Sequence, residues 1–383
     1  MVKHRSSRTD KPSRASLILL IALAFLLLLG TVVLVTRLPE DEAWQWAGST
    51  SADQDSQMSG FTCSAAEAQT LYPFLDGVIR LTPERVTYLD ILGSERYAID
   101  TDFTAPFLIQ QGRWLLVADR EGTGYLMLSE QGEQYRGRLE GRVGGAAINE
   151  NGMVALIQDR QDNTGIVTVL EAETGRSLYD CHFPESGYVL SLAFTPDGSY
   201  FDVNLINTDG STAQTILKRY SIDGTQQGQR LPDLPGLQPL LLHNGDGDPV
   251  VCGFNSITAL SYSTDQPLWQ QTYARIHAVT SDARGVWTLS QKNSQDMIGL
   301  YRIDMNGAEK QWREIGENTV EPLLSSDYIA IGNGARLILL SSRDGKEIKT
   351  ETLNAEIIRM GFSGQDSLLI VTAGGVSRLP LGT

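Results

Sequence analysis

The sequence predicts an all-β fold, a β-propeller of seven blades with eight also allowed, preceded by one transmembrane helix. Beyond Asp76 short apolar runs are separated by turn residues, and no stretch after residue 77 holds a 3.6-residue period. Two kinds of turn recur at a regular interval, which is typical of a repeat architecture. Near the N-terminus, one uncharged run is long enough to cross a bilayer.

The clearest copy of the repeat is SLAFTPDGSY, residues 191–200. It is expected to form a short strand, a tight turn at 195–198 and a second strand that starts at Tyr200. Proline presets φ for the first turn position, aspartate bonds back to the backbone, and glycine tolerates positive φ. This stretch therefore predicts a strand-turn-strand unit, and weaker copies lie on both sides of it.

The recurring turns divide the chain into units. One kind places a polar residue before glycine and is found at 130–132, 173–175, 222–224, 305–307 and 343–345, with a less clean copy at 264–266. With that copy included, the turn recurs about every 40 residues, near the ~40 to 45 residues of a four-stranded blade. The second kind lies between these, at 151–152, 197–198, 247–248, 284–285 and 364–366. Each unit reads strand a, turn, strand b, loop, strand c, turn, strand d. Six units fit between Pro106 and Leu353, and residues 77–100 and 357–381 are expected to share a closing blade.

Four segments are predicted along the chain. Residues 1–15 form a basic tail, and the uncharged run SLILLIALAFLLLLGTVVLVT at 16–36 forms a transmembrane helix. The charge asymmetry across this helix favours a cytoplasmic N-terminus and a C-terminal domain outside the membrane. A cleaved signal peptide is the alternative, but its apolar region would be shorter. Residues 37–76 are expected to be a polar stalk with a short helical piece at 65–71, and 77–383 the propeller.

Charge and cysteine content restrict the function. The formal charge is -15, although the basic tail contributes five Lys and Arg against one Asp, so the rest of the chain is more acidic still. Such a body lacks the clustered basic face that nucleic acid requires. Three cysteines, Cys63, Cys181 and Cys252, are too few for a disulfide scaffold. Buried thiols in strands are favoured over one bridge plus one free thiol.

Several of these motifs resemble known families. LAFTPDGSY resembles the turn of WD40-like and TolB-like blades, and ETGRSLY at 173–179 with LW at 268–269 resembles the turn between strands c and d of PQQ-type repeats. The whole layout, with DGVIRLTPERVTYLDILGSERYAID and WLLVADREGTGYLMLSEQGE, resembles an uncharacterised family of single-pass, membrane-anchored propeller proteins of Gram-positive bacteria. The resemblance implies a fold and a location, and it brings no assigned activity.

No motif for catalysis, metal binding or a cofactor stands out. H-E-x-x-H, G-x-S-x-G, a P-loop and G-x-G-x-x-G are all absent from the sequence. His182, His243 and His277 fall in or beside separate strands, so they are not expected to form a metal site. Residues 244–248, NGDGD, lack the glycine and glutamate positions of a calcium loop and are better explained as an a–b turn. No cofactor is therefore predicted.

The candidate site residues lie in the loops that join strands b and c. An Asp-Arg pair occurs at the same place in successive units, as Asp119-Arg120 and Asp159-Arg160, and Asp209 occupies a later copy of that loop. Arginine binds carboxylates or phosphates and aspartate accepts from hydroxyls, so these side chains are candidates for a ring around the channel mouth. The competing interpretation is a set of solvated surface residues.

The predicted function is a non-catalytic recognition or scaffolding module at the cell surface, with a protein or a glycan as the partner. The alternative is an extracytoplasmic enzyme that acts on cell-wall or environmental polysaccharide. That alternative requires two loop carboxylates ~5 to 10 Å apart in a concave pocket.

Overall fold

The computed structural model describes residues 59–159, 165–184, 187–208, 213–234, 236–316, 319–320 and 322–381. The chain divides into two units, and the second, from Gln57 to Thr383, holds the sheets. The predicted tail, transmembrane helix and most of the stalk lie outside the described residues. Among those that are described, no helix combines the length and the apolar character needed to cross a membrane.

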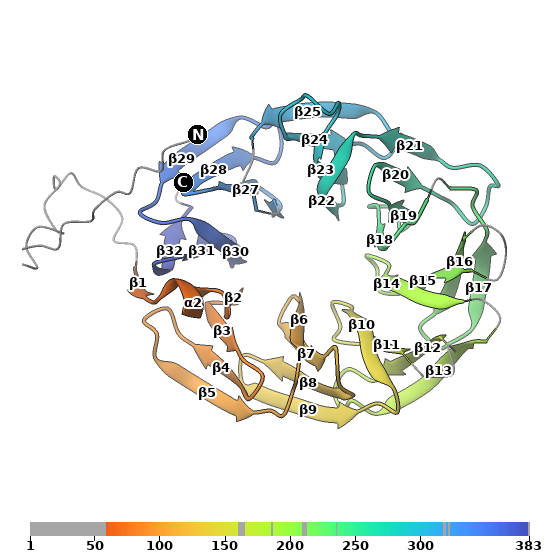
Figure 1. Ribbon diagram of the computed structural model, residues 1–383, viewed down its shortest axis with the longest axis horizontal. Coiled ribbons are helices and arrows are strands. Elements are labelled where there is room, and N and C mark those ends of the chain that lie inside the picture. The colour runs from red at the N-terminus through yellow and green to blue at the C-terminus, as the bar shows by residue number, and fades with distance from the viewer. Residues whose placement is uncertain are drawn as a thin grey trace, which may run out of the picture. The chain divides into compact units, whose positions relative to one another are not determined.

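Eight four-stranded antiparallel sheets make a ring of eight blades. Strand a of each blade lies nearest the centre of the ring and strand d at its rim (Figure 1). In the order a to d, the first four blades are: blade 1, β2 (Leu71–Phe74), β3 (Gly77–Leu81), β4 (Arg85–Leu89) and β5 (Glu95–Asp100); blade 2, β6 (Pro106–Gln111), β7 (Trp114–Asp119), β8 (Gly124–Ser129) and β9 (Gly132–Arg138); blade 3, β10 (Arg142–Ile148), β11 (Val154–Asp159), β12 (Gly165–Leu170) and β13 (Ser177–Phe183); blade 4, β14 (Tyr188–Phe194), β15 (Tyr200–Asn207), β16 (Gln214–Ser221) and β17 (Gln226–Arg230).

The other four blades follow the same order. They are: blade 5, β18 (Leu240–His243), β19 (Pro249–Cys252), β20 (Ser256–Ala259) and β21 (Trp269–Thr272); blade 6, β22 (Arg275–Asp282), β23 (Gly285–Gln291), β24 (Gly299–Ile303) and β25 (Glu309–Glu314); blade 7, β26 (Leu323–Leu324), β27 (Tyr328–Asn333), β28 (Arg336–Ser341) and β29 (Glu347–Thr352); blade 8, β30 (Ile357–Ser363), β31 (Ser367–Thr372), β32 (Gly375–Pro380) and β1 (Ser59–Thr62). The a–b and c–d turns lie on one face of the ring, the turn face. The b–c loops and the d–a crossovers lie on the other, the loop face.

The ring closes by joining the two ends of the propeller chain in blade 8. β1 pairs antiparallel with β32, so the first strand supplies the outer edge of the last sheet. Arg359 on β30 then reaches blade 1, where its guanidinium lies 4.0 Å from the centre of the Tyr72 ring and donates to the carbonyls of Gln69 and Leu71. This closure removes the unpaired blade faces that an open array would leave.

The sequence prediction favoured seven blades and allowed eight, and the structure has eight. The eighth arises because residues 77–100 and 357–381 do not share a blade. Each is completed by a strand from the stretch predicted as stalk, β2 for blade 1 and β1 for blade 8. The propeller thus begins at Ser59 and not at residue 77. β1 is only four residues long and β2 contains Pro73, which weakens a strand signal. The helical piece predicted at 65–71 is present but shorter, as α2 (Ala65–Ala68), and Leu71 already begins β2.

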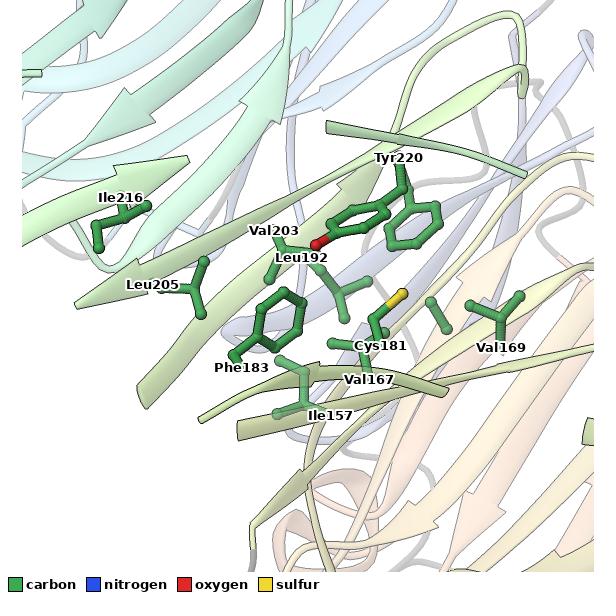
Figure 2. Close-up of a cluster of buried hydrophobic side chains, with 12 residues drawn as sticks. Ile157, Val167, Val169, Cys181, Phe183, Leu192, Val203, Leu205, Ile216 and Tyr220 are labelled. Carbon is green, nitrogen blue, oxygen red and sulfur yellow. The ribbon is translucent and has the colours of Figure 1, made fainter. Parts of the chain in front are cut away.

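Apolar side chains from facing blades fill the space between them. Figure 2 shows the cluster between blades 3 and 4, in which Cys181 and Phe183 of β13 face Val203 of β15 and Tyr220 of β16. β15 is buried along most of its length, whereas β13 at the rim of its blade turns only part of its residues, Cys181 and Phe183, into the cluster. The free thiols of Cys181 and Cys252 are buried within strands, as predicted, whereas Cys63 lies half-buried after β1.

A second contact recurs near the rim on the turn face. An aromatic side chain of strand d packs against the glycine of the c–d turn in the next blade. A Cβ atom at Gly175, where φ is +66°, would lie 2.2 Å from the ring of Tyr135, so this position requires glycine for both space and conformation. Six boundaries carry the contact: Phe61/Gly93, Tyr97/Gly132, Tyr135/Gly175, Tyr179/Gly224, Trp269/Gly307 and Trp312/Gly345. We call it the aromatic–glycine contact.

Candidate binding site at the junction of blades 4 and 5

Three of the five predicted site residues are described, and each engages its own neighbours. Asp119 is 4% exposed, and its carboxylate accepts hydrogen bonds from the backbone N–H groups of Thr104 at 2.9 Å and Ala105 at 2.8 Å. It thereby ties the crossover from blade 1 to the b–c loop of blade 2. Arg120 lies over the ring of Phe107, 4.8 Å from its centre.

The copy of this pair in blade 3 is built differently. Asp159 forms an ion pair with Arg142 at 2.6 Å, on the surface of the loop face. Arg160 and Asp209 lie outside the described residues. The polysaccharide-cleaving alternative requires two available carboxylates in one pocket, and the described carboxylates of Asp119 and Asp159 are both held by protein groups. A ligand role for these five residues stays a prediction.

The junction of blades 4 and 5 departs from the pattern of the six boundaries that carry the aromatic–glycine contact. Its apolar cluster has four fully or nearly buried members, Leu217, Leu241, Val251 and Leu260, whereas the cluster between blades 3 and 4 has twelve. The c–d turn of blade 5 has no glycine. The roles are exchanged here, because Gly228 of β17 lies against the ring of Tyr262 from blade 5, and an ion pair joins Arg230 and Asp265 at 3.0 Å. This junction therefore depends more on polar contacts than the junction of blades 3 and 4 does.

A buried polar network crosses the same junction. Asp202 on β15 is 0% exposed, and its carboxylate accepts from Arg219 Nε at 2.9 Å, Arg219 Nη2 at 2.7 Å, His243 Nε2 at 2.8 Å and Tyr262 Oη at 3.0 Å. Burial alone raises the pKa of the Asp202 carboxyl, but the hydrogen bonds from Arg219 and His243 outweigh burial and hold this pKa below its ordinary value. Arg219 also lies between the rings of Tyr200 and Tyr262, at 5.6 and 4.6 Å. A buried charge that is fully paired in this way fixes how blade 5 sits on blade 4.

The crossover between these blades is anchored at one fully buried residue, Gln238. Its carbonyl accepts from Asn204 Nδ2 of blade 4 at 2.7 Å, and its Nε2 donates to Ser256 of blade 5 at 3.4 Å. The crossover sequence LPDLPGLQP carries three prolines, which restrict φ. The segment is consequently held on the loop face without belonging to a sheet.

Four large apolar side chains project from this region to solvent. Leu231, Leu237 and Leu240 are 51%, 40% and 40% exposed, and Phe254 in the adjacent b–c loop is 73% exposed. A Cβ atom at Gly253 would lie 2.9 Å from the carbonyl of Leu237, which places the crossover against the loop that carries Phe254. We call these four residues the crossover patch. Tyr188 in blade 4 and Met297 in blade 6 are further exposed apolar residues on the same face.

The other large apolar side chains that are exposed in the described part of the chain lie apart from one another. They sit at or beside the c–d turns of five different blades, at Leu92, Leu178, Ile222, Leu268 and Ile348. Single exposed apolar residues are ordinary, whereas several on adjoining segments of one junction are a mark of an interaction site. The sequence does contain a signal for the patch, because prolines separate the leucines of the crossover. It has no periodicity, however, that would mark these leucines as exposed.

The arrangement can be compared with known proteins. The model of a family of unknown function, DUF5711, matches residues 51–381. The chain belongs to this family. No curated protein matches the DUF5711 chain in sequence.

Solved structures are similar to the DUF5711 chain in fold. BamB from Moraxella catarrhalis has 13% identity and a TM-score of 0.53, and the match covers 85% of this chain and 100% of BamB. The computationally designed protein Ika8 has 13% identity and a TM-score of 0.53, with 81% and 95% covered. The WD40 domain of Pan2 from Neurospora crassa has 11% identity and a TM-score of 0.49, with 73% and 89% covered. At 13% identity the likeness to BamB and Ika8 shows the propeller fold alone.

Proposed function

We propose that the DUF5711 propeller is a protein-recognition scaffold, and that the crossover patch is the surface that contacts the partner. The observation that carries the proposal is the group of four exposed apolar side chains on and beside a crossover that is anchored by the fully buried Gln238. An anchored crossover loses less conformational freedom on binding than an unanchored loop, so the apolar side chains that it presents contribute more of their burial energy to affinity. Phe254, the most exposed of the four, is the expected centre of the contact.

The partner is a protein with a basic surface around an apolar pocket or groove. The chain carries a formal charge of -15, and the five basic residues of its N-terminal tail lie outside the propeller. A second copy of the same acidic propeller would be repelled, whereas a basic partner would be attracted and steered to the patch. The glycan partner and the polysaccharide-cleaving activity expected from the sequence have no comparable surface in their favour and stay predictions.

The proposed setting is the outer surface of the cell membrane, with the propeller tethered by one helix. The uncharged run at 16–36, the basic residues before it and the acidic residues after it support this placement. In this arrangement the propeller holds its partner near the membrane.

Co-purification of the full chain, solubilised in mild detergent, tests the proposal. The patch variant carries Leu237→Ser and Phe254→Ser, and the matched control carries Leu92→Ser and Leu268→Ser, which remove exposed apolar side chains from the turn face. We expect one partner to be recovered with the native chain and the control and lost with the patch variant. The amount of partner recovered with the native chain should also decrease as the salt concentration is raised. Equal recovery with both variants would contradict the proposal.

A further inference from the structure

The turn face carries a pocket at the inner edge of the ring, away from the crossover patch. Its volume is about 250 Å³, and it is lined by the a–b turns of five consecutive blades, 2 to 6. Because strand a of each blade lies nearest the centre of the ring (Figure 1), these turns lie near the centre on the turn face. The pocket is somewhat smaller than the ~300 to 1,000 Å³ typical of sites for drug-sized ligands, so it suits a small molecule or a single side chain.

The lining has the chemistry of an organic-cation site. Phe194, Pro196 and Ile148 give it apolar walls. Its ionisable lining residues are His243, which bonds to the Asp202 carboxylate, and two acidic residues, Glu150 and Asp282. The Asp282 carboxylate is neutralised by Arg284, whose Nε lies 2.9 Å away, whereas exposed Glu150 makes no ion pair among the described residues. A pocket lined by both an aromatic ring and an unpaired carboxylate attracts a cation and repels an anion.

The donor set argues against a metal ion. Among the described residues, no group of three His, Cys, Asp or Glu side chains is placed to hold one. A hard metal cation requires about six oxygen ligands, whereas an ammonium group needs two or three acceptors and an apolar wall for its carbon chain. The cation that fits is therefore organic.

The turns around the pocket are fixed before any ligand binds. Asn149 Oδ1 accepts from the N–H groups of Asn151 and Met153 at 3.0 and 2.9 Å, and Asn244 Oδ1 accepts from Asp246 and Asp248 in the same way at 3.0 and 2.9 Å. His243, at the end of β18, is held by Asp202 at 2.8 Å. A pocket with walls this rigid requires little reorganisation on binding.

We propose that this pocket binds a small primary ammonium group, with Glu150 as its counter-ion and Phe194 as its aromatic wall. The group comes either from a free amine or from a lysine side chain of another protein, since both present the same chemistry. This proposal does not depend on the proposed function, because the crossover patch lies on the opposite face and shares no residue with the pocket.

Titration of the full chain with n-butylammonium, followed by calorimetry, tests the proposal. Butyrate and n-butanol serve as the anionic and neutral probes. The capped peptide N-acetyl-Gly-Lys-Gly-amide, whose only ammonium group is the lysine side chain, distinguishes a lysine source from a free amine. We expect butylammonium to bind and butyrate and butanol not to bind. Binding of the peptide at least as tight as that of butylammonium would assign the pocket to a lysine side chain, and weaker binding would assign it to a free amine.

Two variants in the pocket and one control variant locate the site. Glu150→Gln should weaken butylammonium binding at least about fivefold, because it removes the charge-assisted hydrogen bond. Glu121→Gln, which removes an exposed carboxylate on the loop face, should leave binding unchanged. Phe194→Leu should also weaken binding while keeping an apolar wall. Absence of butylammonium binding, equal binding of butanol, or equal affinity in the two glutamate variants would overturn the proposal.

Discussion

Arg230 of blade 4 and Asp265 of blade 5 form an ion pair at 3.0 Å where six other blade boundaries place an aromatic ring on a turn glycine. The Asp265 carboxylate is fully exposed, so this pair contributes little stability by itself. The boundary depends instead on the buried Asp202 network and a small apolar cluster. Two of the eight junctions lack the aromatic–glycine contact, that of blades 7 and 8 and that of blades 4 and 5, and the latter carries the crossover patch.

The aromatic–glycine contact should be measurable as stability. We expect Gly175→Ala to lower the free energy of unfolding by about 2 to 4 kcal/mol, because the new methyl group both strains a left-handed backbone and meets the Tyr135 ring. Gly334 has a φ of +56° with open space around it, so Gly334→Ala should cost only about 1 to 2 kcal/mol. Urea unfolding of both variants provides the comparison, and equal losses would refute a role for the ring.

Removing the Asp202 charge should destabilise the propeller strongly. Asp202→Asn leaves Arg219 buried without its counter-ion, and we expect a loss of about 3 to 5 kcal/mol in the free energy of unfolding. Asp265→Asn, which alters a fully exposed partner, should cost less than about 1 kcal/mol. A loss in Asp202→Asn no larger than that in Asp265→Asn would show that the network is not what holds the junction.

The same network predicts a pH dependence. The pKa of Asp202 is lower in the folded chain than in the unfolded chain, because Arg219 and His243 bond to the carboxylate despite its burial. Its stabilisation is therefore complete above the unfolded pKa of about 3.9 and is lost as the pH falls through the lower folded pKa. The stability difference between the native chain and Asp202→Asn should be constant near neutral pH and should shrink below about pH 4. Chemical unfolding at several pH values measures it, and a difference that grows on acidification would contradict the assignment.

Ring closure should depend on Arg359. Its guanidinium contacts Tyr72 and two backbone carbonyls of the first blade, so Arg359→Ala should lower the free energy of unfolding by about 1 to 3 kcal/mol. Arg343→Ala, in an exposed c–d turn, should change it by less than about 0.5 kcal/mol. If the two variants were equally stable in thermal unfolding, the contact across the closure would have no energetic role.

The membrane topology can be tested on intact cells that produce the chain. Protease added outside should digest residues 59–383 and spare the basic tail at 1–15. Full protection of the propeller in intact cells, with digestion only after lysis, would place it on the other side of the membrane.

Much of the fold could be predicted from the sequence because each blade contains its own turn signals. The a–b turn at 195–198 and the c–d turn at 173–175 lie where their glycines and aspartates indicate. The strands β1 and β2 were missed because a four-residue strand carries little periodicity and Pro73 opposes strand formation. Their omission also made seven blades look sufficient.

The candidate site was harder to predict, because its residues come together only through the ring. Asp202 and Tyr262 are 60 positions apart and meet across a blade boundary. Asp202 does stand out as a charged residue between apolar neighbours in β15, but its partners cannot be identified without the packing of blade 5 on blade 4. Exposure of Leu237 and Phe254 is likewise a consequence of tertiary structure.

The central claim is tested most directly by photo-crosslinking in the cell. A photoreactive phenylalanine analogue is placed at position 254 in the crossover patch and, as the control, at position 92 on the turn face. We predict one crosslinked protein partner from position 254, absent from position 92 and lost when Leu237→Ser is added. Crosslinks to the same protein from both positions, or none from position 254, would contradict the account.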